Sequence, residues 1–240
     1  MLYICDGAPK SGSTFLFNLI RKTLISKNQI DPKGCLDNCL DNIKTIDNHK
    51  LFVKQLSLND DNTQIIERDI SKKFVLKTHL FEKINLSCKY HIFCSVRDPF
   101  DNALSLYEEY LKCRSQPEGR FKEMKNLSIC LNSNLNYLKL LHKRYLHKNI
   151  SIYVYPDFIN PSNNICNDIL RSLNLSDQLT IADIKAITHE IDFLSRNKKL
   201  FTEFNVGSVG RGKDFMELFT TSQIDEAYEL FEQTKKIAIS

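Results

Sequence analysis

The chain has 240 residues, of which 42% are hydrophobic and 26% charged, and its formal net charge is +4. That length and apolar content suffice for one well-packed core, and only 7 Gly and 6 Pro exclude a disordered or linker-rich chain. We therefore expect a single domain over residues 1–240. The mild charge suits a small anionic ligand as well as it suits nucleic acid, but no run of lysines and arginines marks a nucleic-acid-binding face, so we expect no nucleic-acid partner.

Other broad classes are also disfavoured by the sequence. We find no secretory signal peptide at the start and no apolar run long enough to span a bilayer. The 8 cysteines are scattered and lack the paired spacing of a metal site, so we expect reduced thiols and no bound metal. These features predict a cytoplasmic protein without a membrane partner.

The first 25 residues predict a strand, a turn and a helix. An apolar run begins at Leu2, residues 9–13 are mostly small and polar, and apolar residues recur with helical spacing over residues 14–25. The turn would gather the ammonium of Lys10 and the backbone N–H groups of the helix around one point, which suits a tetrahedral oxyanion. In a nucleoside-triphosphate P-loop the lysine follows the last glycine, whereas Lys10 precedes Gly12, so ATP binding does not follow.

Strands and helices alternate along the rest of the chain. This alternation predicts a P-loop-like three-layer α/β/α fold with a mostly parallel central sheet. Residues 26–70 lack a clear pattern, and we expect a helical cap insertion there that forms part of the acceptor-side wall. Asp98 fits the N-cap of its helix, and Pro99 fits the first turn. We predict strands at 73–79, 90–96 and 150–155, helices at 99–112, 132–147, 161–173, 181–196 and 222–239, and a glycine-rich segment at 207–212.

Five polar residues lie at or just beyond the ends of the predicted strands. Because ligands bind beyond the carboxyl ends of parallel strands, we expect these side chains to converge on one crevice. The residues are Lys10, Lys77, His79, Arg97 and Tyr155.

Two of these positions suggest chemistry. A histidine can take a proton from a hydroxyl near neutral pH, and His79 lies close to Lys77 and to the oxyanion turn, so it is a candidate general base. Ser105 lies roughly two helical turns beyond Arg97, and the two could share an anion. Arg97 could equally form an ordinary salt bridge, and Ser105 could be a surface hydroxyl.

Four segments, in the same order, resemble those of sulfotransferases that use 3′-phosphoadenosine 5′-phosphosulfate (PAPS). Residues 9–15, PKSGSTF, are similar to the 5′-phosphosulfate loop P-K-S-G-T-T-W, and residues 76–80, LKTHL, resemble the K-T-H-L segment. Residues 96–105, VRDPFDNALS, resemble the 3′-phosphate segment R-N-P-x-D-x-x-x-S. Residues 155–158, YPDF, stand where the family has Y-E-D-M. The resemblance spans residues 2–220.

The resemblance implies an enzyme of EC 2.8.2 type, with PAPS as donor, adenosine 3′,5′-bisphosphate (PAP) as product and no metal. It implies that His79 is the base, that Lys77 steadies the transferring group, and that Arg97 and Ser105 bind the 3′-phosphate. Lys10 and Ser105 also belong to the implied catalytic group. The 5′-phosphosulfate would be held by Lys10, Ser11, Gly12, Ser13 and Thr14, with Phe15 and Tyr155 near the adenine.

The chain also departs from the family pattern. Phe15 replaces a tryptophan, which leaves a smaller ring for stacking. The C-terminal R-K-G-x-x-G-D-W-K element is only loosely echoed by residues 207–215. In one alignment Arg211, Gly212 and Lys213 contribute to 3′-phosphate binding, and in the other Asn205 and Val206 occupy the contact positions. The family's dimer motif falls on Met216, Thr220, Thr221 and Asp225, where its Lys, Val and Glu are absent, so the oligomeric state stays open.

Three function classes are therefore in view. The first is a sulfotransferase that acts on a hydroxyl or amine of a small molecule, with natural-product tailoring as one use. The alternative is a divergent P-loop phosphotransferase or nucleotide-binding protein, which would need a lysine after the last loop glycine and a Mg²⁺-binding acid. The third is a non-catalytic binding protein, which would not require the combination of Lys10, Lys77 and His79.

Overall fold

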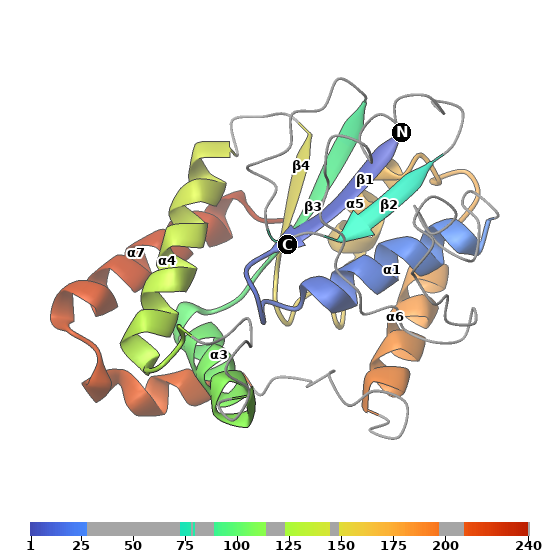
Figure 1. Cartoon of the computed structure of the whole chain (residues 1–240). Helices are drawn as coiled ribbons and strands as arrows, with labels where there is room; N and C mark the ends of the chain where they lie inside the picture. The colour runs from blue at the N-terminus through green and yellow to red at the C-terminus, as the bar shows by residue number, and fades with distance from the viewer. Residues whose placement is uncertain are drawn as a thin grey trace, which may run out of the picture.

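A computed structural model describes residues 1–27, 73–77, 79, 89–113, 123–144, 149–196 and 209–239. These residues form a four-stranded parallel sheet in the order β2-β1-β3-β4, with helices on both faces (Figure 1). The predicted α/β/α fold class is confirmed, while most of the cap insertion predicted for residues 26–70, namely residues 28–70, lies outside the described residues. The strands are β1 (Leu2–Gly7), β2 (Phe74–Lys77), β3 (Tyr90–Val96) and β4 (Ile150–Val154). The helices are α1 (Ser13–Ile25), α3 (Pro99–Cys113), α4 (Leu127–Arg144), α5 (Asn163–Ser172), α6 (Ile181–Arg196) and α7 (Thr221–Ile237), with a 3₁₀ helix η3 (Arg211–Leu218).

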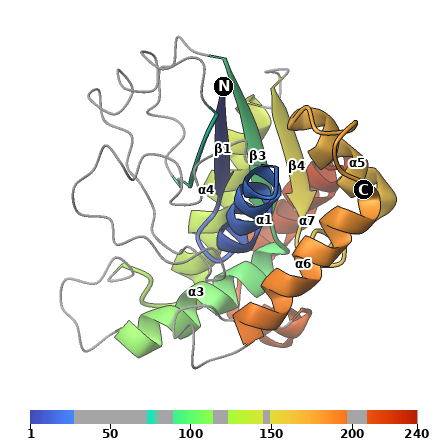
Figure 2. The ribbon, with the colours of Figure 1, turned by 90° about the vertical axis from the view of Figure 1, so that its right-hand side faces the viewer.

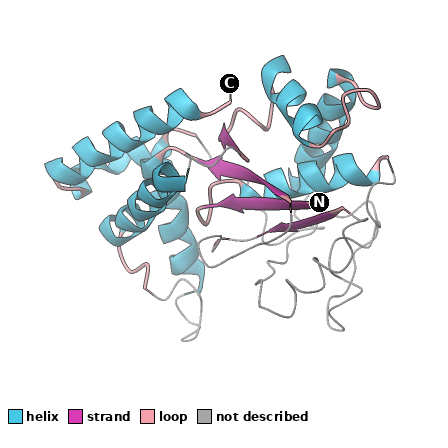
Figure 3. Cartoon of the chain, turned by 90° about the horizontal axis from the view of Figure 1, so that it is seen from above, coloured by secondary structure: helices cyan, strands magenta, loops and turns pink. Residues whose placement is uncertain are grey.

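The sheet buries side chains on both of its faces, which explains why its strands are apolar almost throughout. On one face, Tyr3, Phe93 and Tyr153 pack with residues of α1, α5 and α6. On the other face, Ile4 and Ile92 pack with residues of α4 and α7. Figure 3 shows the sheet between these two groups of helices, and Figure 2 shows α1 and α6 side by side.

The chain leaves the neighbouring strands β1 and β3 toward different helical layers. After β1 it turns into α1, which shares a core with α5 and α6. After β3 it enters α3, which packs with α4, α7 and η3. In open α/β sheets, ligands bind beyond the strand ends at such a point of divergence. The carboxyl ends of β1 and β3 therefore locate the candidate site.

The start of α4 differs from the prediction. The helix begins at Leu127 rather than at residue 132. The side chain of Asn126 accepts the backbone N–H of Ile129 at 2.9 Å, and Leu127 and Leu131 join a buried cluster with residues of α3. The Asn126 cap and packing against α3 thus begin the helix at Leu127, and Leu127, Cys130 and Leu131 already have helical apolar spacing.

The glycine-rich segment leads into a helix that the sequence pattern does not predict. η3 follows Gly210, whose φ of 85° is left-handed, and Phe215 and Met216 pack against the cluster that contains α3. Its polar residues lack a clear helical period, so its conformation depends on α3.

Candidate functional site

A tight turn joins the end of β1 to the start of α1. Lys10 and Gly12 adopt left-handed conformations, with φ of 68° and 92°, and the N–H of Ser11 donates to the carbonyl of Ala8 at 3.0 Å. Gly7 has no room for a side chain, because a Cβ would lie 2.6 Å from the Oγ of Ser11. Among the described residues no side chain caps α1, and its first turn carries no acid. The turn and this helix end therefore suit an oxyanion.

Side chains from β3 and α3 anchor this turn. Two of them, Ser95 and Asn102, are fully buried and were not selected from the sequence. The available signal for Ser95 was a polar residue inside an apolar strand, whereas Asn102 had no comparable signal. The contacts are Ser95 Oγ with Ser11 Oγ at 2.8 Å, Arg97 Nη1 donating to Lys10 O at 3.3 Å, and Asn102 Nδ2 donating to Pro9 O at 3.0 Å.

Lys77 at the end of β2 and His79 just beyond it both reach the turn region. The Nζ of Lys77 donates to the Oγ1 of Thr14 at 2.6 Å, and only 6% of Lys77 is exposed. The Nδ1 of His79 lies 2.5 Å from the carbonyl oxygen of Gly7. Because a carbonyl can only accept, Nδ1 carries the proton in this contact, and the lone pair of a neutral imidazole is then on Nε2.

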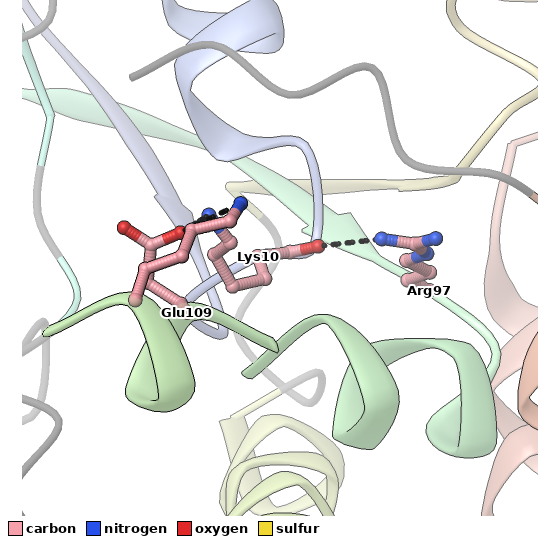
Figure 4. Close-up of polar contacts among 4 residues, drawn as sticks. Lys10, Arg97 and Glu109 are labelled. Carbon is pink, nitrogen blue, oxygen red and sulfur yellow. Dashed lines mark hydrogen bonds and ion pairs between the residues drawn. The ribbon is translucent and has the colours of Figure 1, made fainter. Parts of the chain in front are cut away.

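The ammonium of Lys10 pairs with a carboxylate that sequence reasoning missed. Its Nζ lies 3.1 Å from the Oε2 of Glu109 on α3, and both side chains are largely buried (Figure 4). Lys112 lies 3.8 Å from the same carboxylate oxygen. The figure also shows Arg97 on the carbonyl of Lys10, so α3 and the end of β3 hold both the backbone and the side chain of this residue.

Arg97 and Tyr155 lie together at the ends of β3 and β4. The guanidinium carbon of Arg97 is 5.0 Å from the centroid of the Tyr155 ring. Burial lowers the pKa of Arg97, and the charges of Asp101, Asp98 and Glu108 are among the groups that oppose this shift. The basic group therefore lies in a partly desolvated place, where its attraction for an anion is stronger than in water.

The aromatic residues beside the turn form a packed group. A Cβ on Gly12 would lie 2.7 Å from the Tyr155 ring and 2.8 Å from the Phe158 ring. The Phe15 ring, with 2% of the residue exposed, packs against Phe158 at a centroid distance of 6.0 Å. The close approach explains why glycine occupies position 12, and the adenine role of Phe15 stays a prediction.

The C-terminal candidates contact α3. Arg211 Nη2 lies 3.1 Å from the Oε1 of Glu108. Burial raises the pKa of Asp98, and the positive charge of Lys213 is among the effects that oppose this shift. Gly212 donates its N–H to Asp101 at 2.8 Å. Ser105 is half-buried on the same helix.

The site thus combines a turn suited to an anion, several basic groups and one oriented imidazole. Such a set can bind an anionic group and accept a proton from a neighbouring molecule. No cluster of three His, Cys, Asp or Glu side chains able to hold a metal ion is found in the described ranges. None of the helices described is both long and apolar enough to cross a membrane.

The architecture is similar to that of solved sulfotransferases. A structure of the mouse sulfotransferase SULT7A1 complexed with PAP has a TM-score of 0.62 at 17% identity, and the match covers 97% of this chain and 83% of that one. Retinol dehydratase in complex with androsterone and PAP has a TM-score of 0.52 at 16% identity, covering 99% of this chain and 81% of that one. No protein-family model and no curated protein matches the sequence. The chain has the fold of the sulfotransferases.

Proposed function

We propose that this protein is a sulfotransferase that moves a sulfuryl group from PAPS to a hydroxyl or amine of a small molecule. The observation that carries the proposal is that an imidazole and an ammonium group both lie at the turn. His79 Nδ1 lies 2.5 Å from Gly7 O, and Lys77 Nζ lies 2.6 Å from Thr14 Oγ1. A turn suited to anions would serve many ligands, whereas a base beside it suits transfer to a group that must lose a proton.

Each part of the site has a role in this proposal. The turn and the N-terminus of α1 would bind the 5′-phosphosulfate through Lys10 and residues 11–14. Bound PAPS would supply the sulfuryl group and a phosphate leaving group. Lys77 would stabilise the negative charge that develops during transfer, and the Nε2 of His79 would take the proton of the acceptor. The 3′-phosphate would be bound by Arg97, Ser105, Arg211 and Lys213, with Tyr155 near the adenine.

The proposed acceptor is a small molecule. Retinol dehydratase binds androsterone in its solved structure, which supports small apolar alcohols as the first compounds to test. Amines belong in the same screen, because a histidine base serves either nucleophile. Natural-product tailoring remains one proposed use of the reaction.

The test is thermal stabilisation of the full chain by PAP, by adenosine 5′-phosphate and by ATP with Mg²⁺. A ligand that binds only the folded state adds ~2.7 kcal/mol of stability at a concentration a hundredfold above its Kd. We expect the largest rise in melting temperature with PAP, and PAPS-dependent sulfation in the subsequent acceptor screen. Stabilisation by ATP with Mg²⁺ alone would instead favour phosphoryl transfer, and no response to any nucleotide would contradict the proposal.

A further inference from the structure

A buried carboxylate joins the first turn of α3 to the start of η3. Asp101, which is 3% exposed, accepts the backbone N–H of Gly210 at 2.6 Å and that of Gly212 at 2.8 Å. Hydrogen bonds from backbone amides to a charged carboxylate are stronger than those between neutral groups. The two amides thus hold the start of η3 in one position relative to α3.

The two glycines allow this close approach. A Cβ on Gly212 would lie 2.1 Å from the carbonyl carbon of Phe100 and 2.4 Å from the backbone nitrogen of Asp101. Gly210 has a φ of 85°, a conformation that favours glycine. The backbone of η3 therefore lies directly on the first turn of α3, with no space for a side chain between them.

This contact determines where two basic residues lie. Arg211 is between the two glycines, and Lys213 follows them. Arg211 pairs with Glu108 at 3.1 Å. The negative charge of Glu108 also opposes the lowering of the Arg97 pKa that burial causes. Likewise, the negative charge of Asp98 opposes the lowering of the Arg97 pKa. The positive charge of Lys213 in turn opposes the rise in the pKa of Asp98 that burial causes. The Asp101 contact therefore holds the backbone that carries Arg211 and Lys213 against the first turn of α3, which begins two residues after Arg97.

We propose that Asp101 is a positioning residue that holds Arg211 and Lys213 beside Arg97, and so gives the site its preference for a nucleotide with a 3′-phosphate. The proposal rests on the proposed function, because it assigns the 3′-phosphate of PAPS and PAP to this basic group. It also favours the alignment in which Arg211 and Lys213, rather than Asn205 and Val206, contact that phosphate.

Charge and position predict opposite effects of changing Asp101. Asp101 is negative and acts on Arg97, so through charge alone the Asp101→Asn variant would bind an anion more tightly. Asparagine, however, presents one oxygen and one NH₂ group, so one of the two glycine amides would lose its acceptor. A positioning role therefore predicts weaker binding despite the removal of a negative charge.

The experiment measures the affinities of the full chain for PAP and for adenosine 5′-phosphate by calorimetry. We expect Asp101→Asn to weaken PAP binding about tenfold and to leave the binding of adenosine 5′-phosphate nearly unchanged. Gly212→Ala, which keeps the charge but leaves no room for the contact, is expected to reduce the same preference. Asp183→Asn is the matched control, because the exposed Asp183 carboxylate on α6 also accepts two hydrogen bonds, both from Thr180.

A second measurement needs only the wild type. PAP should slow amide hydrogen exchange at Gly210 and Gly212, whereas adenosine 5′-phosphate should not. Three outcomes would overturn the positioning role of Asp101 without rejecting the donor assignment. They are an unchanged preference for PAP in both variants, tighter PAP binding by Asp101→Asn, and equal amide exchange with the two nucleotides. A wild type that does not prefer PAP would instead reject the donor assignment, and the positioning role with it.

Discussion

The imidazole of His79 is oriented by a contact with the backbone of β1. Its Nδ1 lies 2.5 Å from the carbonyl of Gly7, which directs the lone pair to Nε2. The position of His79 at a strand end was recognisable from the sequence, because Lys77 and the end of an apolar run precede it. The partner of its ring was not, because the two residues are separated by 72 positions and meet only when β2 pairs with β1.

His79→Asn tests the base directly. The asparagine amide can still donate a hydrogen bond, but it cannot take up a proton near neutral pH. We expect kcat for sulfuryl transfer to fall at least about 100-fold, with PAP binding retained. His189→Ala, at an exposed position on α6, is the control and should keep full activity. Full activity of His79→Asn would remove this histidine as the base.

At the scale of elements, the turn after β1 and helix α3 work as a pair. Asn102 on α3 and Arg97 just before it bind the backbone of the turn, and Glu109 binds the ammonium of Lys10. A phosphate at the turn would compete with Glu109 for this lysine. The pairing could not be predicted locally, because Lys10 and Glu109 are 99 positions apart and nothing in either segment specifies the other.

Glu109→Gln should bind PAP more tightly than the wild type does. The ion pair is largely buried, and removing a competitor of about 1 kcal/mol corresponds to roughly fivefold in Kd. Calorimetric titration of both proteins with PAP checks this expectation. Glu190→Gln, which breaks the ion pair of Lys22 on α1, is the control and should leave Kd unchanged. Unchanged or weaker PAP binding by Glu109→Gln would contradict competition for Lys10.

At the scale of the whole molecule, helices cover both faces of the sheet, and the carboxyl group of Asp6 is buried on the face that α4 covers. Asp6, with 2% exposed, accepts a hydrogen bond from the hydroxyl of Tyr137 at 3.3 Å. Burial raises the pKa of Asp6 to about 6, although the N–H of Gly7, the charge of Arg144 and the Tyr137 hydroxyl lower it. The folded state therefore holds a proton more tightly than the unfolded chain, whose carboxyl group titrates near 3.8.

This difference predicts a pH-dependent contribution to folding. The extra proton on Asp6 stabilises the folded state at low pH. This contribution to the free energy of unfolding is lost as the pH rises from about 4 to about 6, because the folded protein then releases that proton. At ~1.4 kcal/mol per pKa unit, the loss is about 3 kcal/mol. Asp6→Asn removes it, so urea unfolding from pH 4.5 to 7.5 should show the variant gaining stability relative to the wild type. A constant difference across that range would contradict the shift.

Local chemistry made much of the fold predictable. An apolar strand, a small polar turn and a helical period are local patterns, and Asp98 begins α3 as predicted by accepting the N–H groups of Phe100 and Asp101. The common edge where strands end follows from parallel pairing, so polar residues after strands could be grouped from their positions in the sequence alone. The whole of η3 was missed, because packing against α3 rather than its own periodicity stabilises it. The early start of α4 was also missed, although Asn126 and the spacing of Leu127, Cys130 and Leu131 mark it locally.

By itself, the sequence determined the order of the strands and α-helices, the α/β class and the candidate residues at the strand ends, since propensity, capping and periodicity act over a few positions. Only the tertiary structure decided the partners of those residues. Glu109 on Lys10, Gly7 on His79 and the Gly210 and Gly212 amides on Asp101 are contacts between distant segments. Such contacts arise when packing brings strands and helices together, because hydrogen bonds and ion pairs depend on distance in space and not on separation along the chain.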